Sequence, residues 1–311
     1  MKIIKGLNAA TVADHGASAA IGNFDGVHRG HQAVLDLARR PGVPLGVVTF
    51  EPHPREVFAP DAPAFRLMGL QARADRLAEL GVDRMFVIEF NRDFSSLTAE
   101  AFCADVLKGQ LGLSHVVTGA DFRFGSKRAG DTAFLKDAGK RLGFDVTIAD
   151  LVSEGTEEVS STAIRAALTE GRIADATKML GHLHRIEGVV EHGEKRGREL
   201  GFPTANMSLT GLMPPKYGVY AVRVQIKDGP HAGHYDGVAS LGVRPMFGEN
   251  KPNLETYIFD FKGDLYGAHA SVGLVAYQRP ELKFDGLDAL IAQMHEDKAE
   301  ARRILAATAT R

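Results

Sequence analysis

Hydrophobic and polar positions follow one rhythm over residues 19–150. Short apolar runs typical of strands alternate with stretches whose apolar residues recur at helical spacing. The apolar runs are 19–22, 45–50, 85–88, 115–118 and 146–149, and the helical stretches are centred on 34–38, 74–78, 98–107 and 132–142. Strands that alternate with helices form a parallel sheet covered on both faces. Because such sheets bind ligands at the carboxyl ends of their strands, we expect a site at that edge.

The rhythm changes after about residue 184. Strand-like runs now follow one another without an intervening helix, and Gly and Pro separate them. These runs are 186–191, 219–226, 235–241, 255–261 and 270–276. The pattern predicts an antiparallel barrel or sandwich.

A helical pattern returns at the end of the chain. Its apolar face is marked by Leu287, Leu290, Ile291 and Met294, and it runs toward Leu305. We therefore predict an α/β domain over residues 1–182, and a β-barrel domain with a C-terminal helix over residues 183–311.

Composition narrows the class of protein. The 311 residues suit two domains, and 44% hydrophobic with 24% charged residues is typical of globular chains. A net charge of -2 shows no basic excess, which argues against a nucleic-acid partner. The single cysteine, Cys103, fits a reducing compartment, and residues 1–16 lack the apolar core of a signal peptide. With no apolar run near the ~18 residues of a membrane span, we expect a cytoplasmic protein without a membrane partner.

The first candidate site is the string IGNFDGVHRGH at residues 21–31, between a predicted strand and a predicted helix. Gly22 and Gly26 allow a tight turn, and His28 and His31 flank Gly30 where the helix begins. A helix N-terminus offers free N–H groups to phosphate, and histidines there can donate hydrogen bonds as charge develops. A glycine-rich turn with two surface histidines is the competing interpretation, which this placement makes less favoured. The string matches neither the P-loop nor the dinucleotide fingerprint.

Three other N-terminal segments carry candidate residues. Ser161 and Thr162 precede a helical run as a natural cap, and Arg165 on its first turn could bind the same anion. A rigid turn ends at Pro54. Asp121, after the fourth predicted strand, could equally hold a metal, hold a flavin group or cap a turn. A phenylalanine such as Phe124 more often packs in the hydrophobic core than stacks on a flavin ring.

The C-terminal half contains GVVEHGEKRGRELGFPTANM at residues 188–207. Its glycines suggest a flexible loop over phosphates, and Arg198 belongs to a basic run that charge alone would assign to a solvated loop. Thr204 and Asn206 share one side of an extended segment, and their oxygens are hard ligands suited to Mg²⁺. A carboxylate in a strand pattern, here Glu255, more often faces solvent than a site.

Several strings together resemble the bacterial bifunctional riboflavin kinase/FAD synthetase family. They are GNFDGVHRGH, TFEPHPREVF at 49–58, GADFRFG at 119–125, VSSTAIR at 159–165 and GRELGFPTAN at 197–206, and they extend the resemblance over essentially the whole chain. The resemblance implies a Rossmann-like nucleotidyltransferase domain, followed by an antiparallel β-barrel riboflavin kinase domain with a C-terminal helix. It further implies that the C-terminal half phosphorylates riboflavin to FMN and the N-terminal half adenylylates FMN to FAD. Mg²⁺ with ATP, FMN and FAD as substrate or product, and flavoprotein apoenzymes as transient acceptors follow as expectations.

The same resemblance assigns roles to particular residues. In the N-terminal half the ATP-binding residues are Gly22, Phe24, Asp25, Gly26, His28, Gly30, His31, Ser161, Thr162 and Arg165, with His28 and His31 catalytic, and the flavin-binding residues are Pro54, Asp121 and Phe124. In the C-terminal half the ATP-binding residues are Gly193, Arg198, Gly201, Pro203, Thr204 and Asn206, of which Thr204 and Asn206 hold the metal. Glu255 is the expected base for the riboflavin 5′-hydroxyl, and Arg279, Glu281 and Phe284 lie near the flavin.

The chain departs from the family pattern where VASLGVRPMFG stands for VANxGxRPTFG. Ser240 replaces an Asn and Met246 a Thr, which leaves open an adenylyltransferase whose barrel merely binds flavin. A non-enzymatic flavin- or nucleotide-binding regulator is a second alternative, opposed by the intact phosphate-binding strings and Glu255. A different nucleotidyltransferase, such as a cytidylyltransferase, is a third, and the PTAN string argues against it.

Overall fold

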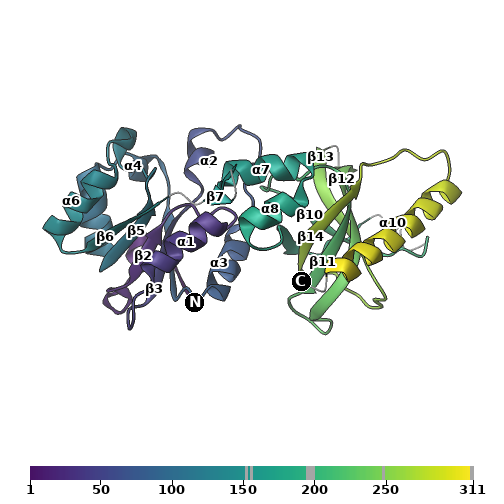
Figure 1. The fold of residues 1–311 in the computed structure, drawn as a ribbon, viewed down its shortest axis with the longest axis horizontal. Helices are drawn as coiled ribbons and strands as arrows, with labels where there is room; N and C mark the ends of the chain where they lie inside the picture. Colours follow the sequence, from purple (N-terminus) through teal and green to yellow (C-terminus); the bar gives the residue numbers. More distant parts are fainter. Residues whose placement is uncertain (151–152, 155–156, 194–199, 247–248, 309–311) are drawn as a thin grey trace. The chain divides into compact units, whose positions relative to one another are not determined.

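The computed structural model describes residues 1–150, 153–154, 157–193, 200–246 and 249–308. The chain divides into two compact units, shown in Figure 1. The first unit contains Met1–Pro63 and Leu70–Ser160, and the second contains Ala64–Gly69 and Ser161–Arg311.

A six-stranded parallel sheet forms the first unit. Its strands are β1 (Lys2–Lys5), β2 (Ser18–Ile21), β3 (Leu45–Glu51), β4 (Arg84–Glu89), β5 (His115–Gly119) and β6 (Asp145–Ala149), in the order β1-β4-β3-β2-β5-β6. The five strands expected from the apolar runs are confirmed. The edge strand β1 was not predicted, because it is short and only one of its four residues is buried.

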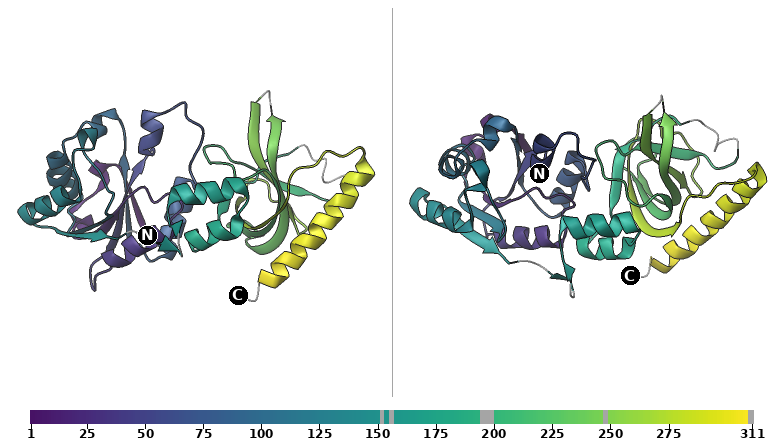
Figure 2. Two further views of the ribbon diagram at one scale, coloured as in Figure 1. Left: turned by 45° about the horizontal axis from the view of Figure 1, so that its top comes forward. Right: turned by 90° about the horizontal axis from the view of Figure 1, so that it is seen from above.

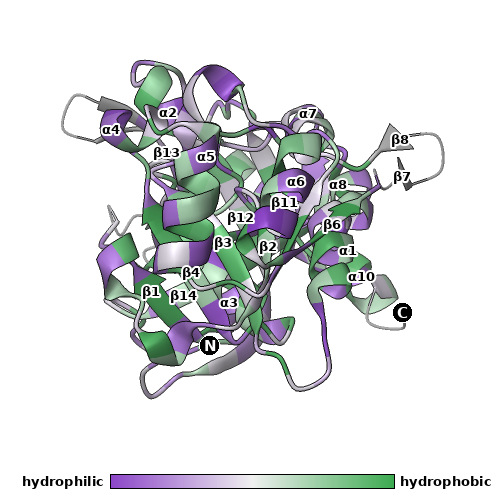
Figure 3. Ribbon diagram, turned by 90° about the vertical axis from the view of Figure 1, so that its left-hand side faces the viewer, coloured by the Kyte–Doolittle hydropathy of each residue, from purple (hydrophilic) through white to green (hydrophobic). Residues whose placement is uncertain are grey.

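Helices cover both faces of this sheet (Figure 2). They are α1 (Arg29–Ala38), α2 (Pro54–Phe58), α3 (Leu70–Glu79), α4 (Arg92–Ser95), α5 (Ala99–Ala101), the π-helix η3 (Phe102–Gln110) and α6 (Thr132–Leu142). Short 3₁₀ turns occur at η1 (Leu7–Ala9), η2 (Val12–Asp14) and η4 (Ser126–Arg128), and a small hairpin pairs β7 (Ser153–Glu154) with β8 (Glu157–Glu158). Apolar residues of η3 and α6 pack on alternate residues of the strands, which are predominantly hydrophobic (green in Figure 3).

The strand order fixes where a ligand site can form. From β2 the chain adds β3 and β4 on one side and then crosses to add β5 and β6 on the other. The order of strands therefore reverses between β2 and β5, and open α/β sheets bind ligands outside the carboxyl ends of the strands at this switch point. The loops that leave these two ends contain the strings GNFDGVHRGH and ADFRFG.

The second unit is a nearly closed antiparallel barrel preceded by α7 (Ser161–Glu170) and α8 (Ile173–Leu180). Its strands are β9 (Arg185–Val189), β10 (Thr204–Ser208), β11 (Gly218–Ile226), β12 (Gly233–Met246), β13 (Glu249–Ile258) and β14 (His269–Arg279), in the order β10-β13-β12-β11-β14-β9. Beyond β9, the amide of Glu191 donates a 2.9 Å hydrogen bond to the carbonyl of Asn206 on β10. This bridge brings the two ends of the sheet together, so the structure decides for a barrel over a sandwich.

Helix α10 (Leu287–Thr308) lies on the outer face of the barrel. The predicted helix is confirmed, but the positions it buries are Asp297, Ala301 and Leu305, while Leu287 is 56% exposed. Asp297 accepts hydrogen bonds of 2.7 Å and 2.6 Å from the guanidinium of Arg279 on β14. This ion pair therefore attaches the middle of α10 to strand β14. The first turns of the helix lie before this contact. Among the described residues, no helix is both long and apolar enough to cross a membrane.

A buried polar chain links three strands near the amino ends of the sheet. Ser18 donates its hydroxyl hydrogen to the carbonyl of Ala38 (2.6 Å), so the 2.8 Å contact with His115 has the His115 Nδ1–H as donor. The hydroxyl of Thr147 then donates to Nε2 of His115 over 2.9 Å. Burial lowers the pKa of His115 to about 4, helped by the charge of Arg40, which keeps the ring in this neutral form.

We expect this ring to make stability depend on pH. The pKa of His115 is about 4 in the folded chain against 6.5 for the free side chain, so the unfolded chain binds the proton first as pH falls. The contribution is present above pH 6.5 and is lost as pH drops toward 4, by about 3 kcal/mol in the free energy of unfolding. Urea denaturation at stepped pH should show a shallower acid decline for His115→Gln than for the native chain. Parallel declines would contradict this assignment.

Candidate active sites

The loop from β2 into α1 holds two imidazoles against each other. His28 caps α1, since its Nδ1 accepts a 3.3 Å hydrogen bond from the amide of His31. In the neutral ring the proton then resides on Nε2, which makes that atom a donor. The rings of His28 and His31 stack with their centroids 3.7 Å apart, at the helix end whose free N–H groups attract anions. The structure thus brings together the two histidines that the sequence singled out.

His31 has unsatisfied hydrogen-bonding capacity at this position. Its Nδ1 is enclosed and, among the described residues, has no hydrogen-bond partner. Burial lowers the pKa of His31 well below its usual 6.5, and the neighbouring His28 and Arg73 lower it further. A bound anion would reverse that electrostatic balance, because it favours the protonated ring. The pair therefore suits phosphate oxygens that approach from outside the protein.

The backbone of the loop is strained around these rings. Phe24 and Val27 are buried with φ of 52° and 43°, a conformation that a β-branched residue such as Val27 rarely adopts. Such strain concentrates at functional sites. Gly30 lies so close to His28 that a Cβ there would sit 3.1 Å from the imidazole Nδ1 and Cε1. Asp25, 4% exposed, completes the turn.

The predicted flavin residues of the first unit lie in loops after β3 and β5. Pro54 is the first residue of α2, behind the cap His53. Asp121 is exposed just beyond β5. Phe124 is only 7% exposed and stacks on Phe122 with centroids 5.4 Å apart, inside the aromatic part of the core. Its packing accords with a core residue, and its role toward flavin stays a prediction.

Ser161, Thr162 and Arg165 lie at the start of α7 and belong to the second unit. Arg165 donates from Nε to the carbonyl of Phe65 over 2.7 Å, and its guanidinium lies 5.3 Å from the centre of the Phe65 ring. Residues 64–69 join this unit through such contacts. A phosphate contact from these three residues stays a prediction.

In the barrel, the strand register aligns three polar residues. Asn206 on β10 is paired with Glu255 on β13, and Glu255 is paired with Ser240 on β12. Residues 254, 256 and 258 of β13 face inward and are buried, so Glu255 lies on the outer face. The base predicted from the sequence and one of its two predicted metal ligands are therefore direct neighbours.

The amide of Asn206 is held by polar rather than apolar neighbours. Its Nδ2 donates to the carbonyl of Thr204 over 3.3 Å, and its Oδ1 accepts from Nδ2 of Asn253 over 3.1 Å. Sequence analysis missed Asn253, although a residue two positions before Glu255 shares its face of a strand. Gly193 packs closely against this amide, since a Cβ at position 193 would be 2.5 Å from Nδ2 of Asn206.

A cavity of about 280 Å³ opens beside Thr204. Apolar side chains of Val190, Ile258, Leu265 and Tyr266 contribute to its walls, together with Pro203. Thr256 also lines it, and the buried Oγ1 of this residue has no hydrogen-bond partner within the part of the chain that the structure describes. Apolar walls with a few polar atoms suit a planar ring such as a nucleobase.

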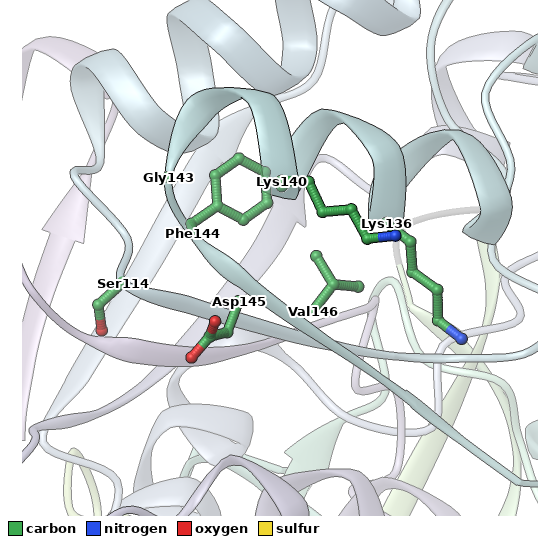
Figure 4. Close-up of a pocket in the computed structure, with 8 residues that line it drawn as sticks. Ser114, Lys136, Lys140, Gly143, Phe144, Asp145 and Val146 are labelled. Carbon is green, nitrogen blue, oxygen red and sulfur yellow. The ribbon is translucent and has the colours of Figure 1, made fainter.

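A second cavity, of about 570 Å³, lies in the first unit (Figure 4). Lys136 and Lys140 of α6 line it together with Phe144 and Asp145, at the amino end of β6. None of the predicted site residues lines this cavity. Because parallel sheets bind their substrates at the opposite, carboxyl edge, we assign it no role in the chemistry.

The other C-terminal candidates differ in setting. Arg198 and the side chain of Met246 lie outside the described residues. Gly201 occupies an exposed turn with φ of 80°. Glu281 reaches back to β12, where a Cβ on Gly242 would be 2.1 Å from its Oε1. Phe284 is half-buried, and Arg279 is engaged by Asp297 as described above.

A phosphate-suited loop at the switch point of a parallel sheet, together with a barrel that aligns hydroxyl, amide and carboxylate groups, defines a two-module nucleotide-dependent transferase. Residues 10–163 match the family model of FAD synthetase, and residues 180–305 match that of riboflavin kinase. The chain belongs to the bifunctional riboflavin kinase/FMN adenylyltransferase family. Its C-terminal domain is the kinase that converts riboflavin to FMN, and its N-terminal domain is the adenylyltransferase that converts FMN to FAD.

Relatives support this along the full length. The chain is 41% identical to the bifunctional riboflavin kinase/FMN adenylyltransferase of Escherichia coli K12, over 99% of both chains, and 42% identical to that of Pseudomonas fluorescens, over 100% of both. The enzyme of Bacillus subtilis shares 36% identity over 91% of each chain. A crystal structure from Streptococcus pneumoniae, described as a macrolide-efflux protein, matches with a TM-score of 0.84 and 32% identity, covering 97% of this chain and 98% of that one.

The contact at Gly193 yields a prediction for the kinase. Gly193→Ala should push the Asn206 amide out of place and lower the rate of FMN formation from riboflavin about tenfold, the cost of a small misplacement at a reacting centre. Gly188→Ala is the matched control, because a Cβ there meets nothing within 4 Å. Both variants should still make FAD from supplied FMN. Equal kinase rates in the two variants would show that Gly193 does not constrain Asn206 functionally.

Proposed function

We propose that each domain holds its own ATP and performs its own transfer with the residues named above. The observation that carries this proposal is the stacked pair His28 and His31 at the N-terminus of α1, with an enclosed ring nitrogen that has no protein partner among the described residues. The free N–H groups at this helix end, beside the two imidazoles, suit a phosphate group.

In the N-terminal site, the loop at Gly22–Gly26 and the first turn of α1 bind the triphosphate through backbone N–H groups. A phosphate oxygen of FMN attacks the α-phosphorus of ATP, and diphosphate leaves. His28 donates from Nε2 and His31 from its ring to the oxygens on which charge accumulates. No covalent nucleophile is needed, because positioning and charge stabilisation supply the rate.

In the C-terminal site, Thr204 and Asn206 would hold Mg²⁺ beside the nucleotide's phosphates, with the nucleobase in the adjoining 280 Å³ cavity. Glu255 accepts the proton of the riboflavin 5′-hydroxyl, whose oxygen attacks the γ-phosphorus while ADP leaves. The hydroxyl and amide oxygens of Thr204 and Asn206 are hard donors, and the side chain of Asn206 is already oriented by Asn253. When bound, Mg²⁺ supplies charge neutralisation for the phosphates at both sites.

Flavin binding rests on the side chains around each loop. We infer that Pro54, Asp121 and Phe124 contact FMN. Phe58 is a further candidate, because this residue is 60% exposed and its ring lies edge-on to Phe90. For riboflavin we retain Arg279, Glu281 and Phe284, with Arg279 acting through its hold on α10.

The remaining expectations complete the proposal. Gly193, Arg198, Gly201 and Pro203 form the loop and rim over the kinase nucleotide, while Ser161, Thr162 and Arg165 contact the phosphates of the adenylyltransferase. The functional boundary is at residues 182–183. Flavoprotein apoenzymes accept the products, and the cytoplasm is the place of action.

The two sites should be separable by mutation. His31→Ala should lower FAD formation from FMN by about 100-fold, because it removes a donor to the developing charge, and leave riboflavin phosphorylation intact. Glu255→Gln should do the reverse, with a loss of about 100-fold or more in FMN formation. Chromatography of flavins after incubation with ATP and Mg²⁺ measures both. Loss of both activities from either substitution would contradict two independent sites.

A further inference from the structure

The structure contains a buried arginine that neither transfer mechanism uses. Arg73 lies on α3 with 1% of its surface exposed, in a helix whose other buried residues are Ala72, Ala74 and Leu77. A buried guanidinium is costly to the fold unless its hydrogen bonds and charge are matched. Its position therefore needs an explanation.

Its contacts tie two loops of the first unit together. Nη1 of Arg73 donates to the carbonyl of Asn23 over 2.8 Å, and Nη2 donates to Oε2 of Glu51 over 2.7 Å. Asn23 follows β2 in the turn that leads to the histidines, and Glu51 ends β3. The hydroxyl of Thr49 also donates to the carbonyl of Asn23, over 3.2 Å. The fork geometry of arginine suits such a two-point attachment.

The attachment falls at the base of the strained turn. Asn23 directly precedes Phe24, the first of the two buried residues with positive φ. Strained backbone persists only where the surroundings over-determine it, and a carbonyl held by two donors provides such a restraint. If Asn23 were released, the turn could relax and carry His28 and His31 with it.

The charge of Arg73 also acts on the imidazoles. It is one of the causes that lower the pKa of His31, next to burial and the neighbouring His28. Its partner Glu51 keeps 28% of its side chain exposed, so water screens the carboxylate more than the guanidinium. A positive contribution therefore remains beside the loop, where it favours a polyanionic ligand.

We propose that Arg73 is a positioning residue of the adenylyltransferase, holding the Asn23 carbonyl so that the loop presents both histidines to the triphosphate and adding positive charge beside it. The inference rests on the proposed role of this loop in ATP binding. It concerns only transfer to FMN, so riboflavin phosphorylation by the same chain is an internal control.

The test uses three variants and one control. Arg73→Met should lower kcat/KM for ATP in FAD formation about 30-fold through loss of position and charge together. Arg73→Lys keeps the charge but reaches only one acceptor, so we expect about a fivefold loss. Arg73→Met leaves Glu51 without the guanidinium and should lower the melting temperature, and the double variant with Glu51→Gln should recover part of it without restoring the rate. Arg76→Met, which removes a partly buried arginine paired with Glu79 on the same helix, should retain the native kcat/KM for ATP.

A pH profile separates positioning from mere stability. Two titratable or charged groups among the described residues act on the pKa of His31, namely His28 in the same loop and Arg73 from α3, and Arg73 is in turn paired with Glu51. Arg73 helps to lower the pKa of His31, so without this cation the pH limb of FAD formation that this ring sets should move to higher pH in Arg73→Met and stay in place in Arg73→Lys. Native kcat/KM in the folded double variant would overturn the inference, as would equal loss of riboflavin phosphorylation in Arg73→Met. Absence of FAD formation by the native chain would instead refute the proposed function.

Discussion

The hydrogen bond from the amide of His31 to Nδ1 of His28 is the interaction on which the adenylyltransferase site depends. It caps α1, assigns the proton of His28 to Nε2 and sets the two rings in a stack 3.7 Å apart. A side chain at position 30 would press on the His28 ring, which would have to shift by a few tenths of an ångström, so glycine favours this stack. The left-handed backbone at Phe24 and Val27 is the strained part of the turn that brings the chain to this cap.

The strand order determines whether this helix cap lies where a ligand can bind. In the first unit the reversal of strand order between β2 and β5 places the loop at the edge where parallel sheets bind ligands. In the second unit, chemistry follows from register. Because β10, β13 and β12 are paired in sequence, Asn206, Glu255 and Ser240 form one row on the outer face. A slip of β13 by one residue would turn Glu255 toward the barrel interior, away from Asn206 and Ser240.

Much of this could be predicted from the sequence, since period-2 and period-3.6 patterns report directly on buried faces. Strands β2 to β6, an antiparallel barrel or sandwich, and α10 followed from them. Strand β1 did not, because four residues with one buried position carry too little signal. Helix α10 buries the predicted face in its C-terminal part, at Ala301 and Leu305, but the ion pair of Asp297 with Arg279 on that face could not be seen from a pattern of apolar residues.

The site residues also divide into those that the sequence identified and those that only the structure shows. Motif strings identified His28, His31, Asn206 and Glu255, whose residue types and spacing carry the chemistry. Arg73 and Asn253 escaped notice because their importance comes from partners distant in the sequence. Arg73 contacts residues 50 and 22 positions before it, and Asn253 contacts a residue 47 positions before it. Such contacts are set by strand order and register, which local patterns do not specify.

The most direct test of the central claim is ¹⁵N NMR of the imidazoles of His28 and His31 during titration with a non-hydrolysable ATP analogue. In the nucleotide-free protein at neutral pH the ring of His31 should be neutral. Nucleotide should shift the resonances of His31 toward the protonated, hydrogen-bonded form and perturb those of His28, whereas riboflavin alone should leave both sets unchanged. An imidazolium signal from His31 in the free protein, or resonances that do not respond to nucleotide, would contradict the account.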